Sequence, residues 1–323
     1  MKHPHRATIV AIITGGWVVF SSTAYSVRAA DYPARQVRVV VPFPPGGGAD
    51  TISRTIFSKL SEAFGQQFII DNRGGSSGTI NAKATPDGYT ILHDATGHSI
   101  NPAMFAKLPY DTARDFEPVF LAGVVPNLLV MHPSVKAANV PELIALAKST
   151  REGLNWASSG TGSVQHMALE LFKVSAGIPL NHIPYKGGGP VLIDLVGGHI
   201  KFYFSNAAAS TGHVRAGTVR AIAHTGRGRL SAFPDLPPMA DTLPGYEAFE
   251  WNGVFVPANT TRAIVTRLNA GLNESLRTPA VTDRLAALSV QTRANSPAEF
   301  GSYVKAEIAK WGKIVRGANI KVE

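Results

Sequence analysis

Residues 37–53, VRVVVPFPPGGGADTIS, decide the fold, because they combine a strand, a loop and a helix in immediate succession. The β-branched run at 37–41 predicts a buried strand, and Pro42 ends it since proline cannot donate to a sheet ladder. The glycines at 46–48 leave room for a close partner, and Asp50 is a good N-cap for the helix that follows. Backbone N–H groups at such a helix start point outward, so the segment predicts a site for a small anion.

This glycine loop does not match the nucleotide-binding templates. It lacks the Gly-x-x-x-x-Gly-Lys-Ser/Thr pattern and the Gly-x-Gly-x-x-Gly spacing. Many strand–loop–helix units with glycine bind nothing, and that alternative stays open for the loop taken alone. By itself the loop favours a carboxylate or another small anion.

The first 29 residues have the organisation of an export signal. A basic start precedes an apolar stretch at 9–20, which is too short to span a bilayer, and small and polar residues follow at 21–30. This pattern predicts a signal peptide, 1–29, cleaved after Ala29, with Ala30 and an uncleaved anchor as the alternatives. We therefore expect an exported, soluble protein. The chain has no cysteine, which excludes disulfides, thiolate catalysis and a lipid anchor on cysteine.

The charge of the chain favours a small ligand over a macromolecule. The formal net charge is +9, and Lys2, Arg6 and Arg28 of the leader contribute three of these charges. The other basic residues are scattered, without a dense run interleaved with aromatics, so we expect no nucleic-acid partner. His, Asp and Glu are not clustered at metal-ligand spacing, so we expect neither a metal nor a cofactor. A moderately basic surface suits an anionic small molecule.

Strand and helix patterns alternate along the chain, which predicts an α/β protein with a parallel, helix-covered sheet. Two extended segments, 120–125 and 128–131, are the first candidate crossing between domains, and 251–257 is the candidate return. We therefore predict a discontinuous first domain, residues 31–125 plus 248–323, and a second domain, residues 126–247. Hinges are expected near 125–126 and 250–251.

Residues 94–101 follow the third predicted strand and supply the first group of candidate site residues. In parallel sheets ligands bind beyond the carboxyl ends of the strands, where Thr96, His98 and Asn101 would lie. The alternative is that Ser99 or Asn101 only caps a helix opening at Pro102.

A second strand–loop–helix unit occurs at 154–174. Its loop contains Ser159, Gly160, Thr161, Gly162 and Ser163, and the first turn of the following helix has no Asp or Glu. The positive end of that helix is therefore free to accept an anion. The alternative is a serine N-cap on an ordinary glycine turn. Together the two units predict anion sites in both halves of the chain.

From about residue 32 to about residue 315 the sequence resembles the periplasmic solute-binding receptors of tripartite tricarboxylate transporters, the Bug family. The resemblance is carried by an ordered series of motifs rather than by one of them. They are Tyr32-Pro33, PFPPGGGAD at 42–50, Asn72-Arg73 with its glycine loop, ATPDGYT at 84–90, INP at 100–102, YD at 110–111 with DF at 115–116, and PYKG at 184–187.

The resemblance implies a two-domain type II periplasmic-binding (Venus flytrap) fold that closes on a small carboxylate, such as a di- or tricarboxylate or an aromatic acid. It implies a monomeric, non-enzymatic periplasmic receptor that serves the membrane permease of a tripartite tricarboxylate transporter, or a sensor. Loop backbone and two ordered waters would hold the ligand. The matching positions are Phe43, Gly47, Ala49 and Asp50; Thr96, His98 and Asn101; Ser159, Gly160, Thr161, Gly162 and Ser163; and, nearby, Tyr185 and Lys186.

One departure from the family pattern concerns the strand that contains Phe204. Family members often carry Asp after it, where this chain has Ser205 followed by Asn206. Loss of a carboxylate there predicts a ligand whose second end is anionic or hydrogen-bonding rather than a free ammonium. Asp50 would oppose this, but as a helix cap its charge is already engaged.

A secreted hydrolase using Ser or His on a carboxylate ester in the same cleft is the competing hypothesis. The sequence has no Gly-x-Ser-x-Gly elbow and no His-Glu-x-x-His helix, which disfavours catalysis. A phosphate-binding module is a third alternative. It is disfavoured because neither glycine loop contains Arg or Lys.

Overall fold

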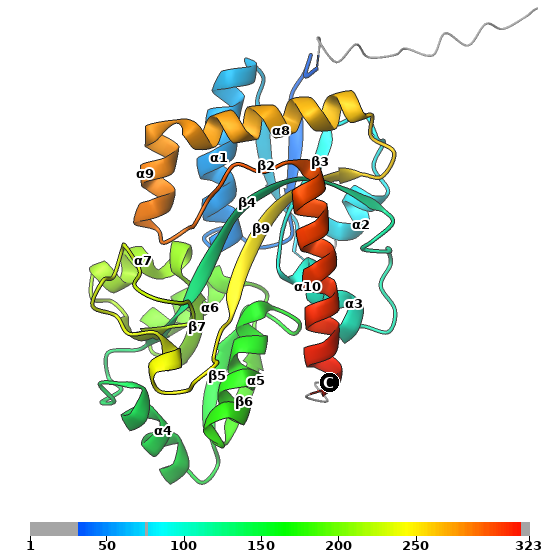
Figure 1. The fold of residues 1–323 in the computed structure, drawn as a ribbon. Coiled ribbons are helices and arrows are strands. Elements are labelled where there is room, and N and C mark those ends of the chain that lie inside the picture. Colours follow the sequence, from blue (N-terminus) through cyan, green and yellow to red (C-terminus); the bar gives the residue numbers. More distant parts are fainter. Residues whose placement is uncertain (1–31, 75–76, 318–323) are drawn as a thin grey trace, which may run out of the picture.

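The computed structural model describes residues 32–74 and 77–317, so the expected leader lies outside the described part. Nine strands of this part form one continuous sheet in the order β2-β1-β3-β9-β4-β7-β5-β6, with β8 also pairing with β4. Figure 1 shows the sheet in two halves, with β4 and β9 running lengthwise along the middle of the molecule.

The first half-sheet contains the strand of the opening motif at its centre. Strands β1 (Val37–Val41), β2 (Phe68–Asn72) and β3 (Thr90–Ala95) are parallel, whereas β9 (Phe249–Pro257) runs antiparallel to β3. The expected wholly parallel sheet is therefore wrong, because the returning strand inserts beside β3. The helices of this half are α1 (Gly48–Phe64), α2 (Ser77–Ala82), α3 (Gly97–Met104), α8 (Arg262–Arg277), α9 (Pro279–Ala287) and α10 (Pro297–Gly317).

The second half-sheet repeats the pattern with β5 (Leu154–Ser158) parallel to both β6 (Leu180–Pro184) and β7 (Phe202–Asn206). Its fourth strand is β8 (Arg220–His224), and a short 3₁₀ turn, η2, covers Met239–Asp241. The helices of this half are α4 (Val140–Ser149), α5 (Val164–Ala176), α6 (Gly188–Val196) and α7 (Ala207–Arg215).

A single long strand, β4 (Phe116–Met131), joins the halves instead of the two segments expected from the sequence. Its first part pairs with β9 and its last part with β7 and β8. Pro126 removes only one donor, and the next N–H, of Asn127, donates to Thr225 Oγ1 at 2.9 Å. The strand therefore continues through the proline. Val125 pairs with Glu250, so the two expected hinge positions are neighbours in the sheet.

Two helix starts differ from expectation. Helix α3 begins at Gly97 and carries Pro102 inside it rather than opening there. Helix α7, which the sequence analysis missed, begins directly after β7 because Asn206 both ends the strand and caps the helix, accepting a hydrogen bond from Ala208 N at 2.8 Å. Both changes bring helix N-termini to the ends of strands.

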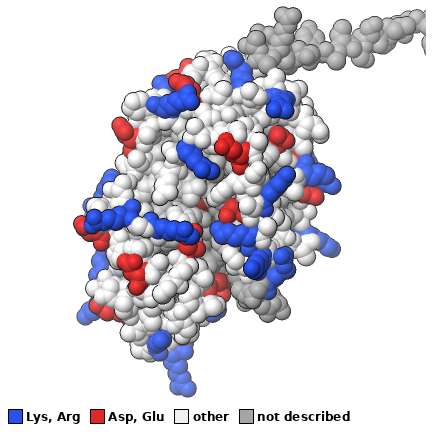
Figure 2. Space-filling model, viewed as in Figure 1, with Lys and Arg blue, Asp and Glu red and all other residues white. Residues whose placement is uncertain are grey.

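The visible surface carries mixed charge. Figure 2 shows Lys and Arg side chains dispersed among Asp and Glu rather than gathered into one basic area. Within residues 32–74 and 77–317, no helix is both long enough and apolar enough to cross a membrane.

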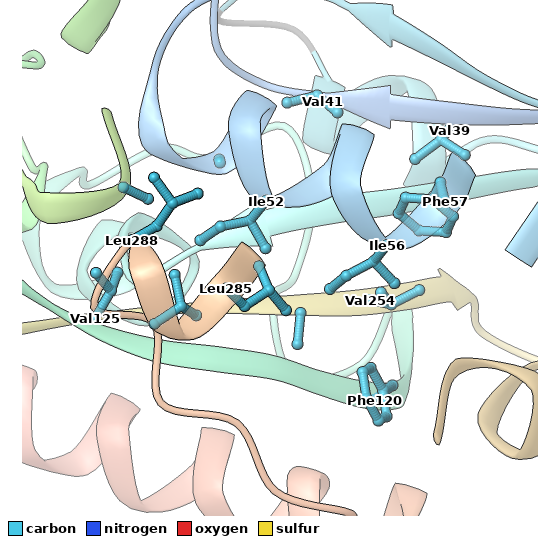
Figure 3. Close-up of a cluster of buried hydrophobic side chains, with 14 of the residues drawn as sticks. Val39, Val41, Ile52, Ile56, Phe57, Phe120, Val125, Val254, Leu285 and Leu288 are labelled. Carbon is cyan, nitrogen blue, oxygen red and sulfur yellow. The ribbon is translucent and has the colours of Figure 1, made fainter. Parts of the chain in front are cut away.

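The core of the first half holds α1 firmly against the sheet. Figure 3 shows α1 side chains packed between the strands and the α9 region, and all ten labelled residues belong to one buried cluster. Ile52, Ile56 and Phe57 are fully buried. Burying each such side chain stabilises the fold by about 1.5–3 kcal/mol. The N-terminus of α1 is thereby anchored in a fixed position at the middle of the molecule.

Candidate functional site

A cavity of about 350 Å³ lies between the two halves of the sheet. The first half contributes residues 42–43, 47–49, 78, 94–97, 101, 105 and 108–110, and the second contributes 159–165, 188, 203, 206 and 209. Glu250, on β9, completes the lining. The two glycine loops singled out in the sequence therefore share one cavity.

Five helices begin at this cavity. Gly48, Gly97, Val164 and Gly188 are the first residues of α1, α3, α5 and α6 and line it directly, and Asn206 brings the start of α7 to it. Within these five described first turns, Asp50 is the only acidic side chain. Lys, Arg and His are absent from the described residues of the lining. Attraction of an anion into the cavity would therefore have to come from backbone N–H groups at helix ends.

Asp50 supports the first glycine loop from behind instead of capping α1. The N-cap is Gly47, and Asp50 lies in the first turn, outside the cavity lining. Its carboxylate accepts hydrogen bonds from Gly46 N at 3.0 Å and Asn72 Nδ2 at 2.9 Å, and pairs with Arg54 at 2.9 Å. Burial alone would raise the pKa of Asp50, but these bonds together hold the pKa below its usual value.

The second glycine loop is held by side chains beneath it. Ser163 is the N-cap of α5, as the alternative interpretation had it, and also lines the cavity. Ser158 Oγ accepts from Gly160 N at 3.1 Å and lies 2.6 Å from His182 Nε2. The φ values of Gly160 and Gly162, +127° and +81°, require glycine.

A pair of stacked histidines lies under this loop. The rings of His166 and His182 are 3.9 Å apart, and His166 Nδ1 accepts from Gly162 N at 3.4 Å. Burial, with the nearby His182 and Lys173, lowers the pKa of His166 to about 3. His166 is therefore neutral at physiological pH and remains an acceptor for the loop backbone. Within the loop, Ser159 Oγ lies 2.6 Å from Tyr203 Oη.

Ten of the fifteen predicted site residues line the cavity: Phe43, Gly47, Ala49, Thr96, Asn101, Ser159, Gly160, Thr161, Gly162 and Ser163. Thr96 also ties the site to β9, since its Oγ1 accepts from Trp251 N at 2.8 Å. The other five residues lie outside the lining: Asp50, His98, Tyr185, Lys186 and Ser205.

His98 and Tyr185 lie outside the lining, and each has a side-chain partner. His98 is 1% exposed, its Nδ1 is 3.1 Å from Asp94 Oδ2, and its ring stacks on Phe255 at 4.3 Å. Tyr185 donates its hydroxyl to Asp194 at 2.7 Å.

At the end of β7, Asn206 and not Ser205 reaches the cavity. Ser205 is fully buried and lies outside the lining, whereas Tyr203 and Asn206 of the same strand line the cavity. A carboxylate at position 205 would therefore not line the cavity, contrary to the expectation drawn from Ser205. Asn206 packs against Gly48 so closely that any Cβ there would collide with the amide.

Two acidic residues of the lining were missed by the sequence analysis. Asp94 stands at the end of the third predicted strand, so the strand-end rule used for Thr96 applied to it equally. Its Oδ1 accepts from Ala95 N at 2.8 Å. Glu250 was considered only as a hinge neighbour, because its place on β9 opposite β4 depends on long-range pairing.

Glu250 is held in place by an amide. Gln165 Nε2 donates to Glu250 Oε2 at 2.5 Å and to Asn127 Oδ1 at 2.9 Å. Burial raises the pKa of Glu250, although the amides of Gln165, Asn206 and Asn252 act in the opposite direction. Within the described part of the chain, no group of three His, Cys, Asp or Glu side chains is arranged to hold a metal ion.

The two glycine triplets of the sequence, 46–48 and 187–189, meet beside the cavity. A Cβ on Gly189 would stand 2.4 Å from Pro45 O, and a Cβ on Gly47 would stand 3.9 Å from Gly188 N. The halves of the molecule therefore touch backbone to backbone at this point.

Comparisons with known proteins agree with this architecture. The model of the tripartite tricarboxylate transporter family receptor matches residues 52–320. Among solved structures, R. palustris Rpa4515 with adipate is 38% identical with a TM-score of 0.87, and the match covers 90% of this chain and 99% of that one. MatC (Rpa3494) from Rhodopseudomonas palustris, with bound malate, is 32% identical with a TM-score of 0.82, covering 88% and 100%.

The periplasmic binding protein BugD is 28% identical with a TM-score of 0.87, and the match covers 90% of this chain and 100% of BugD. The sequence motifs, the mixed two-part sheet and these similarities all agree. The chain belongs to the tripartite tricarboxylate transporter family of receptors, the Bug family, and has its two-domain type II periplasmic-binding fold.

Proposed function

We propose that this protein captures a small carboxylate in the cavity between its two halves and delivers it to the membrane permease of a tripartite tricarboxylate transporter. The observation that carries the proposal is the convergence of five helix N-termini on a cavity whose described lining contains no cationic side chain. Helix N-termini bind anions through free N–H groups and the helix dipole. A volume of about 350 Å³ suits a small molecule.

The ligands of two similar proteins support the carboxylate class. Adipate is bound by a protein 38% identical to this chain, and malate by one 32% identical. Both ligands carry two carboxyl groups and an aliphatic body. The lining here offers Phe43, Phe105, Leu108 and Val164 for such a body.

The ten cavity-lining residues predicted from the sequence are the proposed ligand contacts. Asp50 and the histidines beneath the second loop are proposed as supports that hold backbone N–H groups in place. Donors that are already fixed lose less conformational entropy when the ligand binds, so these supports contribute to affinity without touching the ligand.

Ligand capture is proposed to close two lobes, residues 31–125 plus 248–323 and residues 126–247. The pairing of Val125 with Glu250 supports a hinge where β4 and β9 pass between the half-sheets. The ligand would shift the population toward the closed arrangement because helix ends from both lobes contact it only there. We propose that the mature receptor is a periplasmic monomer, released by cleavage of residues 1–29, that needs no cofactor and performs no catalysis.

A thermal-shift screen of the mature chain against a carboxylate library tests this function. We expect a saturable rise in Tm with a few di- or hydroxycarboxylates and no change in the ligand during incubation. Absence of a shift with every carboxylate, confirmed by calorimetry, would reject it.

The hydrolase alternative is tested in the same samples. The 2.6 Å contact between Ser158 Oγ and His182 Nε2 is the geometry that a serine nucleophile needs. Ser158, however, is fully buried and lies outside the cavity lining. Turnover of simple carboxylate esters that is lost in Ser158→Ala would favour the enzyme.

A further inference from the structure

We propose that Glu250 selects the second polar group of the ligand, and that this group is an O–H donor: either a hydroxyl or a carboxyl that binds in its protonated form. The inference rests on the proposed function of the cavity as a carboxylate site. Ser205, from which the sequence predicted an anionic or hydrogen-bonding second group, lies outside the cavity lining.

The carboxyl of Glu250 is built into the cavity wall. Glu250 is 6% exposed and lines the cavity from β9. Gln165 fixes one of its oxygens at 2.5 Å, and Gln165 is itself anchored on Asn127 Oδ1. Asn127 Nδ2 in turn donates to Ala248 O at 3.1 Å, two residues before Glu250. This chain of buried hydrogen bonds gives the carboxyl a defined direction.

The charges around Glu250 exclude a second ionised carboxylate next to it. The charged and titratable side chains that line the cavity with it are Asp94 on β3, Tyr110 after α3, and Tyr203 on β7, and none of them is cationic at physiological pH. Gln165, Asn206 and Asn252 are neutral amides. Two carboxylates in contact at low dielectric repel strongly unless they share a proton. A hydroxyl avoids the repulsion by donating to Glu250.

An ammonium is disfavoured by the same arrangement. Five helix N-termini place partial positive charge around the cavity, which opposes a cation. Asp94, the other acid, is already bonded to Ala95 N and to the ring of His98.

Calorimetric titration of the mature chain with adipate, succinate, malate and aspartate tests the proposal and separates the two sources of the O–H group. If a protonated carboxyl binds, the protein–adipate complex takes up about one proton from the buffer. This proton uptake is measured by comparing the binding enthalpy in buffers of different ionisation enthalpy. In that case the adipate Kd rises by up to about tenfold for each unit of increase in pH. If a hydroxyl binds, malate exceeds succinate in affinity by about tenfold or more with no proton uptake.

The variant Glu250→Gln keeps the shape of the side chain and an oxygen for Gln165. We expect it to abolish the proton uptake, or to reduce the malate preference to about twofold. The matched control is Glu247→Gln, three residues earlier, whose carboxylate is bonded to Arg227 on the surface. The control should behave as the wild type. Thermal melting of both variants reports folding, and the wild-type titrations decide the proposal even if Glu250→Gln does not fold.

Three outcomes overturn the proposal. One is wild-type binding of a carboxylate without proton uptake and without a hydroxyl preference. Another is an unchanged preference and uptake in folded Glu250→Gln. The third is aspartate binding at least about tenfold more tightly than malate. In these cases the cavity still binds carboxylates, so the proposed function stands while the role of Glu250 fails. If no carboxylate binds the wild type at all, both fail.

Discussion

Replacement of Gly189 by alanine tests whether ligand capture needs the backbone contact between the two glycine triplets. Gly189 lies in the first turn of α6, and its added Cβ would stand 2.4 Å from Pro45 O in the other half of the molecule. Within its own half the substitution suits a helix. The clash therefore affects only the arrangement in which the halves touch.

The size of the effect follows from this distance. A carbon and a carbonyl oxygen approach to about 3.3 Å, so the loop must withdraw by about 0.9 Å or the lobes must stay apart. Overpacking of this kind costs about 1–3 kcal/mol, which corresponds to a 5- to 150-fold loss of the closed population. We expect the Kd for the preferred carboxylate to rise by such a factor, while the Tm of the ligand-free protein stays within about 2 °C of wild type.

Calorimetry gives the Kd, and small-angle scattering with and without ligand gives the change in shape. The matched control is Gly212→Ala in α7, where nothing lies within 4 Å of the new Cβ. It should raise stability by about 0.5–1 kcal/mol and leave the Kd unchanged. A Gly189→Ala protein that binds within about twofold of wild type would refute the role assigned to this contact.

Three further changes test the buried core and the supports of the site. His93 is fully buried and its pKa is lowered to about 4 by burial, so the unfolded chain takes up a proton below pH 6.5 that the folded chain does not. The free energy of unfolding should therefore fall by about 1.6 kcal/mol between pH 6.5 and 5 because of this residue, and urea titrations should find that contribution missing in His93→Leu. Asp50→Asn should lose about 1–2 kcal/mol of stability and weaken ligand binding, since Gly46 N loses a charged acceptor. An unchanged urea midpoint and an unchanged Kd would count against Asp50 as a support of the first glycine loop. Tyr203→Phe removes the 2.6 Å partner of Ser159 and should raise the Kd by about fivefold, which calorimetry measures, and an unaltered Kd would show that Ser159 does not need this partner.

Local patterns were sufficient to predict most elements and both glycine loops. The strand at 37–41 and the helix after it depend on β-branched residues and on apolar spacing that act over a few residues, and β1 and α1 follow them closely. The failures are non-local. Helix α7 has weak amphipathicity and starts only because Asn206 caps it, and β4 passes through Pro126 because Thr225, far along the chain, accepts its next N–H.

The residues of the candidate site show the same difference between local and non-local signals. Loop residues such as Gly160, whose φ of +127° requires glycine, could be expected at the cavity because glycine loops are visible in the sequence. Glu250 was not assigned to the site because its position depends on the register between β9 and β4. Ser205 was expected to face the cavity, but it lies outside the lining. The next residue, Asn206, lines the cavity as the N-cap of α7, a helix that was not predicted from the sequence.

The absence of a cation from the described lining affects how ligand binding would drive the proposed closure of the lobes. A lysine or arginine on one lobe would hold a carboxylate in the open protein as well as in the closed one, and equal affinity for two states shifts no equilibrium. Here α1 and α3 belong to one half and α5, α6 and α7 to the other. Each helix end contributes about 0.3–2 kcal/mol to an anion, so a ligand held first by the two ends of one half would gain about 1–6 kcal/mol from the other three when the halves come together. That is the order of differential affinity that a nearly complete shift from open to closed requires, about 5.5 kcal/mol.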